Sequence, residues 1–96
     1  MKPSAALNAH RLQVRQLVAD HNSANPRVFG SAATGHDAEG SDLDLLVDPL
    51  PGTTLLDLGG LQIALEDVLG VPVDVRTPLD LPPGFRHRVL ASALPV

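Results

Sequence analysis

The 96-residue chain contains no cysteine, no tryptophan and no tyrosine, and it has only two phenylalanines. Without cysteine there is neither a disulfide framework nor a thiolate metal site, so we expect a protein of the reducing cytoplasm. Seven Lys and Arg against eleven Asp and Glu give a net charge of −4. A long nucleic acid would gain little counterion release from such a chain, and the scarcity of aromatic rings removes stacking platforms. Extended nucleic acid is therefore not the expected partner.

Long hydrophobic runs are also missing. Nowhere do about eighteen apolar residues follow one another, and the N-terminal stretch lacks the apolar segment of a secretory signal, so we expect no association with a membrane. The hydrophobic share is nevertheless 44%, which is typical of a globular protein rather than a disordered one. We expect one domain over residues 1–96, close to the smallest size that sustains its own core.

The most informative stretch covers residues 27–48. A short apolar run leads into Gly30 and Ser31, and after ten further residues Asp42 and Asp44 lead into a second apolar run. In a strand alternate side chains share a face, so the two carboxylates would occupy one small volume. At about 4 Å and an effective dielectric of about 20 they repel by roughly 4 kcal/mol. A hard divalent cation such as Mg²⁺, which binds carboxylate and phosphate oxygens, would offset that repulsion.

The Gly-Ser pair suits the phosphates of the same ligand. Gly30 lets the backbone approach a phosphate closely, and residues 31–33 have the composition of a first helical turn, whose free N–H groups favour an anion. The pattern therefore predicts phosphate binding at Gly30 and Ser31.

Apolar spacing and turn residues predict an α/β fold with a small mixed sheet of about three strands flanked by helices. We expect helices over 4–21, 31–34, from 53–60 to about 70, and after 83, and strands over 27–30, 42–47 and 71–76. The long helix can begin at a cap by Thr53 or Thr54, or only at Gly60, because Gly59 and Gly60 each cost about 1 kcal/mol relative to alanine. A helical connection allows the second and third strands to be parallel, and Pro72 favours an edge or the start of a strand.

The combination of Gly-Ser, ten residues, and Asp-x-Asp before an apolar strand resembles the nucleotidyltransferase superfamily with the DNA polymerase β-type palm, most closely its minimal nucleotidyltransferase family. The stretch from Pro82 to Ala93 also resembles the end of these proteins, so the resemblance covers residues 27–96. It implies a palm-like core. Read alone, Asp74 would be a polar residue on the wet face of its strand, but the family carries its third acidic residue in such a strand. The resemblance thus implies catalytic and metal-binding roles for Asp42, Asp44 and Asp74, and nucleotide binding by Gly30 and Ser31.

The reaction implied by this resemblance uses ATP and two Mg²⁺ ions. An acceptor hydroxyl, deprotonated near Asp74, attacks the α-phosphorus and pyrophosphate leaves. Minimal nucleotidyltransferases of this type resemble the antitoxin of a toxin–antitoxin system whose toxin is a HEPN-type ribonuclease, and the implied activity is AMPylation of a toxin tyrosine. A chain this small favours a folded protein as acceptor, because a protein brings its own binding surface.

One departure from the family pattern concerns the residues after Gly-Ser. Active members often carry arginines there, whereas this chain has Ala32, Ala33 and Thr34. Each missing charge-assisted contact is worth about 1.5–3 kcal/mol, so ATP would bind more weakly unless Arg27, Arg76 or the partner substitutes. The alternative function is a catalytically weak or inactive antitoxin that neutralises its toxin by binding alone. A third, a stand-alone small-molecule nucleotidyltransferase, lacks an evident acceptor pocket.

The remaining polar residues have ordinary interpretations. The four histidines lack zinc spacing and are expected at the surface, although His36, between Ser31 and Asp42, could reach a triphosphate. Asp48 is expected to begin the following proline turn and not to be a ligand. The basic residues 86–88 form either a solvated helix face or a contact with an acidic partner.

Overall fold

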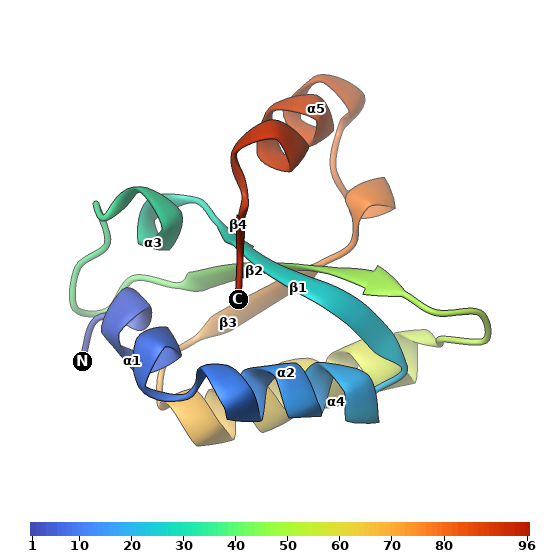
Figure 1. Cartoon of the computed structure of the whole chain (residues 1–96), viewed down its shortest axis with the longest axis horizontal. Coiled ribbons are helices and arrows are strands. Elements are labelled where there is room, and N and C mark those ends of the chain that lie inside the picture. The colour runs from blue at the N-terminus through green and yellow to red at the C-terminus, as the bar shows by residue number, and fades with distance from the viewer.

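The computed structural model describes residues 1–96 and is shown in Figure 1. Its elements, in chain order, are α1 (Pro3–Ala9), α2 (Arg11–Asp20), β1 (Ser23–Phe29), α3 (Ser31–Thr34), β2 (Leu43–Pro49), α4 (Leu55–Leu69), β3 (Val73–Arg76), the 3₁₀ helix η1 (Pro78–Asp80), α5 (Pro83–Ser92) and β4 (Leu94–Pro95). No helix combines the length and the apolar character needed to cross a bilayer.

The strands form one mixed sheet in the order β3-β2-β1-β4. β1 is antiparallel to both β2 and β4, while β2 and β3 are parallel and are connected by α4. The predicted α/β class, the parallel pair and the edge position of the strand that follows Pro72 are confirmed. The sheet has a fourth strand, β4, beyond the expected three. The sequence does not predict it, because two residues that include Pro95 give no alternating pattern.

The two faces of the sheet are covered unequally. Helices α1, α2 and α4 pack on one face, as the lower layer of Figure 1 shows for α2 and α4. They enclose a core of thirteen buried residues that includes Leu43, Leu45 and Val47 of β2. On the opposite face Phe29 and Leu46 pack in a small cluster with Leu81 and Val89 from the C-terminal part of the chain, and the partly buried Ala93 packs against it. The residues that alternate with the main core, among them Asp44, therefore face this thinly covered side.

The expected helix over 4–21 is two helices. At His10 the backbone leaves the helical region, with φ −133° and ψ 27°, and its N–H donates to the carbonyl of Leu7. The apolar residues of α2 are not all buried as a result. Val14 and Val18 are buried, but Leu12 is 74% exposed.

The long helix α4 begins at the earlier of the predicted starts. Thr54 caps it by accepting a hydrogen bond from the N–H of Asp57, whose side chain accepts in return from the N–H of Thr54. This capping box and three buried leucines stabilise a helix that runs through both glycines. The helix ends where Gly70 adopts the left-handed conformation, as its sequence position predicts.

Several strand boundaries differ from the prediction by one or two residues, and the start of β1 differs by four. β1 begins at Ser23 rather than Arg27, because a bulge between Ala24 and Arg27 accommodates Pro26. Asp48 lies within β2 instead of beginning the turn, and its Oδ1 is 3.1 Å from Nη1 of Arg27.

Candidate active site

Asp44 and Asp74 lie side by side on the parallel pair of strands. Their Cα atoms are register partners between β2 and β3, and on its other side Asp44 is the partner of Phe29 in β1. Leu43 and Leu45 are fully buried on the main-core side, which places Asp44 on the opposite face. Two carboxylates that are thirty residues apart in the chain are thus neighbours across one strand pair.

The environment of Asp44 disfavours its negative charge. Burial raises the pKa of its carboxyl above the ordinary value, the charges of Asp74 and Asp42 raise it further, and Arg76 lowers it in part. The pKa of Asp44 therefore responds to both other predicted site carboxylates. A cation bound beside Asp44 would remove this penalty.

The three aspartates are not equally engaged. Asp42 is exposed and precedes β2, and Oδ2 of Asp74 is 3.1 Å from Nη2 of Arg76 in a half-exposed ion pair. No group of three His, Cys, Asp or Glu side chains is arranged to hold a metal ion. Chemically the donor set fits Mg²⁺, because it consists of hard carboxylate oxygens whose mutual repulsion a cation would relieve. Completing the site would require side-chain adjustment, and Asp74 could offer the carboxylate oxygen that does not pair with Arg76.

Gly30 occupies a turn that another residue would not tolerate. Its φ of +72° and ψ of −152° belong to a region that is essentially restricted to glycine. A Cβ atom placed there would also collide with Oδ2 of Asp44. Ser31 follows as the first residue of α3, as predicted. Gly30 therefore lies directly against the carboxylate of Asp44, whereas Ser31 lines neither of the hollows around that carboxylate.

Two open hollows meet around Asp44, Phe29 and Phe85. The first, which we call the basic hollow, has a volume of about 390 Å³ and is bounded beyond these shared residues by Gly30, Ala33, Thr34, Arg88, Val89, Ser92 and Leu94. The second, the acidic hollow, has about 360 Å³ and is bounded by Asp74, Arg76, Asp80, Leu81 and Pro82. Sequence reasoning found no acceptor pocket, whereas the acidic hollow opens beside Asp74 and can admit a side chain.

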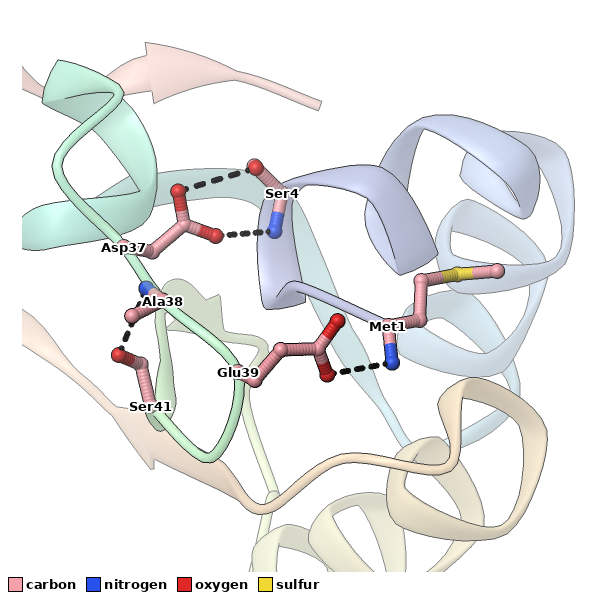
Figure 2. Close-up of polar contacts among 6 residues, drawn as sticks. All are labelled: Met1, Ser4, Asp37, Ala38, Glu39 and Ser41. Atoms are coloured by element: carbon pink, nitrogen blue, oxygen red, sulfur yellow. Dashed lines mark hydrogen bonds and ion pairs between the residues drawn. The ribbon is translucent and has the colours of Figure 1, made fainter.

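The loop between Gly30 and Asp42 is tied to the N-terminal helix, as Figure 2 shows. Asp37, which is buried, accepts hydrogen bonds from the backbone N–H and the hydroxyl of Ser4, at 2.8 and 3.0 Å. The hydrogen bond from the Ser4 backbone holds the pKa of Asp37 below its ordinary value. The amino group of Met1 pairs with Glu39 at 2.8 Å. Asp37 thus caps α1 although it lies 33 residues from Ser4 in the chain, so no local sequence pattern predicts this role.

His36, which the sequence placed between Ser31 and Asp42, lies at the surface of that loop. Its Nδ1 lies 3.0 Å from Oγ1 of Thr34 at an exposed site, and it lines neither hollow. Arg27, one expected substitute for the missing arginines, pairs with Asp48, and the other, Arg76, pairs with Asp74.

Comparisons with known proteins agree with this fold and motif. The model of the nucleotidyltransferase domain family matches residues 7–95. A Methanocaldococcus jannaschii protein named "putative protein adenylyltransferase" is 36% identical over 90 residues, which are 94% of this chain and 97% of the relative. The chain belongs to the nucleotidyltransferase domain family. A solved structure named "putative minimal nucleotidyltransferase" matches with a TM-score of 0.88 and 46% identity, over 97% of this chain and 95% of that one.

A more distant match shows the fold alone. A toxin–antitoxin crystal structure with AMP-PNP aligns with a TM-score of 0.74 at 19% identity, over 88% of this chain and 69% of that one. The family model, the archaeal relative and the 46%-identical structure confirm the resemblance to minimal nucleotidyltransferases, and with it the classification of the chain as a transferase.

Proposed function

We propose that this chain transfers AMP from ATP to a hydroxyl group of a partner protein. The observation that carries the proposal is the placement of Asp44 and Asp74 as register partners, with Gly30 against Asp44 and an open hollow on each side. The name of the archaeal relative supports a protein as acceptor. The AMP-PNP in the toxin–antitoxin structure supports ATP as the donor and a toxin as the partner.

The metal ligands in this proposal are Asp42, Asp44 and Asp74, which would together hold two Mg²⁺ ions. Bound Mg²⁺ supplies Lewis-acid chemistry, neutralising charge on the phosphate oxygens of the nucleotide. The carboxylates also set the charge of the cleft: without a cation they repel one another and a triphosphate. The chain is therefore expected to bind ATP strongly only together with the metal.

In this proposal the residues on one side of Asp44 bind the triphosphate, and those on the other side act on the acceptor hydroxyl. Gly30 and Ser31 bind the triphosphate, and Asp74 lines the acidic hollow, where it receives the proton of the acceptor hydroxyl. The acceptor oxygen forms a bond to the α-phosphorus while the bond from that phosphorus to the bridging oxygen breaks. Pyrophosphate leaves, and the products are the AMP-modified acceptor and a protonated carboxylate that returns its proton to solvent.

We further propose that the partner is a HEPN-type toxin and that the acceptor is a tyrosine, so that the chain acts as an antitoxin. This part depends on the family resemblance. The second candidate is an antitoxin that neutralises its toxin by binding alone. Two observations favour it: residues 32–34 contain no arginine, and Arg76 forms an ion pair with the carboxylate of Asp74. Both functions need the same partner, so one experiment separates them.

The experiment incubates the chain with labelled ATP, Mg²⁺ and the protein encoded by the neighbouring gene, which the proposal expects to be a HEPN-type toxin, followed by mass spectrometry of that protein. Transfer predicts an AMP-sized increment on a tyrosine, and its loss in Asp44→Asn. Asp67→Asn, an exposed carboxylate of α4, serves as the matched control and should remain active. Inhibition of the toxin without an increment would establish masking, and an absence of both would refute the antitoxin proposal.

A further inference from the structure

Arg88 is the one arginine whose guanidinium makes neither a hydrogen bond nor an ion pair within the protein. The chain has six arginines; two form ion pairs with carboxylates, and three donate to a backbone carbonyl. The guanidinium of Arg88 takes part in none of the three ion pairs of the chain. Instead it lines the basic hollow, together with Gly30 and Thr34.

The guanidinium of the exposed Arg88 contacts an aromatic ring rather than a counter-charge. Its Cζ lies 5.9 Å from the ring centroid of Phe85, within cation–π range. That ring packs edge-on against Phe29, with centroids 6.5 Å apart, and Phe29 is the strand partner of Asp44. An aromatic pair therefore connects the guanidinium to the strand that carries the carboxylates.

The helix that carries Arg88 is itself anchored. Nε of Arg86 donates to the carbonyl of Pro78 at 2.6 Å, and its Nη2 donates to Leu81 at 2.9 Å. Val89 is buried against the sheet face. Arg86 thus has a structural role. The guanidinium of Arg88, two residues later, has N–H donors that form no hydrogen bond within the protein. Sequence reasoning treated residues 86–88 as one basic group, but the structure separates their roles.

We propose that Arg88 binds the terminal phosphates of ATP and so replaces the arginines that residues 32–34 lack. This inference rests on the proposed function. The basic and acidic hollows share Asp44, so a triphosphate whose reacting phosphate lies at the aspartates extends its terminal phosphates toward the basic hollow. Arginine binds phosphate oxygens with two parallel N–H donors. The cations expected to substitute, Arg27 and Arg76, are held by Asp48 and Asp74.

The test measures the affinity of the full chain for ATP and for AMP, with Mg²⁺, by isothermal titration. Arg88→Met should weaken ATP binding about tenfold or more and change AMP binding less than twofold, since one charge-assisted contact to the terminal phosphates is lost. Arg88→Lys should bind ATP with intermediate affinity, because lysine keeps the charge but not the fork. His87→Ala, the exposed neighbour on α5, is the matched control and should bind as the wild type does.

The outcomes distinguish this inference from the proposed function. If the wild-type chain binds no ATP, both are overturned. If it binds ATP and Arg88→Met binds it as tightly, the role of Arg88 is overturned and the proposed function stands. An equal loss for ATP and AMP, with the circular dichroism spectrum unchanged, would also overturn the inference, because the loss would then not concern the terminal phosphates.

Discussion

Gly30 is the position at which a single methyl group should disturb both the fold and the site. Its φ of +72° and ψ of −152° impose about 1–3 kcal/mol of strain on any other residue. The Cβ of Gly30→Ala would in addition collide with Oδ2 of Asp44 and approach its Cγ to 3.3 Å. We therefore expect Gly30→Ala to lower the free energy of unfolding by the energy of the backbone strain and by a further contribution from the displaced carboxylate. We also expect the variant to lose transfer activity.

Gly35→Ala is the matched control for the backbone contribution. Gly35 also has a positive φ, +76°, but it lies in the ordinary left-handed region, and no atom lies within 4 Å of the point that a Cβ would occupy. Its substitution should cost about 1–2 kcal/mol. In a domain of this size each kcal/mol lowers Tm by about 4–8 °C, so urea and thermal denaturation can separate the two variants.

A double-mutant cycle isolates the collision. Asp44→Ala removes Oδ2 and Cγ and leaves only the Cβ of residue 44, 3.5 Å from the added Cβ, which is an ordinary contact. Gly30→Ala should therefore cost less in the Asp44→Ala background, by more than about 0.5 kcal/mol. Additive effects within that margin, or a cost of Gly30→Ala no greater than that of Gly35→Ala, would refute the close approach of Gly30 to the carboxylate.

Three further predictions concern the carboxylates and the C-terminal strand. Asp44→Asn should abolish transfer yet leave the metal-free chain no less stable at pH 7, because the raised pKa of Asp44 means that its ionised form destabilises the fold; a loss above about 2 kcal/mol in urea denaturation would contradict this. Asp37→Asn should lower the free energy of unfolding at pH 7. The difference in this free energy from wild type should shrink as the pH falls below the ordinary carboxyl pKa, because the pKa of Asp37 is lowered and its carboxylate stabilises the fold until it is protonated. A difference that does not change with pH would refute the role of the Asp37 charge. Deletion of residues 94–96 should lower protection of α5 in hydrogen exchange while protection of α4 is kept, since β4 pairs with β1 and the N–H of Val96 donates to Pro26; unchanged protection of α5 would show that β4 does not hold it.

The parts of the fold that the sequence predicts are those with a local cause. Apolar runs beside Gly30 and Asp44 identify β1 and β2, and the capping residue and terminal glycine identify α4. The connection through a helix is enough to expect the parallel neighbour that carries Asp74. In each case the signal lies within a few residues of the feature.

The parts that were missed depend on partners far away in the chain. Asp37 reads as one polar residue of a polar loop, because its partner Ser4 is 33 residues distant. Arg88 and Arg86 look equivalent in sequence, and only the carbonyls near η1 distinguish them. The separation of α1 from α2 at His10 likewise follows from packing, since no proline or glycine marks it.

The unequal cover of the sheet explains why the cleft lies where it does. A second full layer of helices would enclose Asp44 and Asp74 and leave two neighbouring carboxylates buried without water, which is costly unless they are neutralised. Here the second face is covered only by a small cluster around Leu81 and Val89, so space remains on both sides of Asp44. The same short segment that leaves this space also carries Arg88 and Phe85 to its edge. The C-terminal part of the chain therefore both limits the core and supplies the positive side of the site.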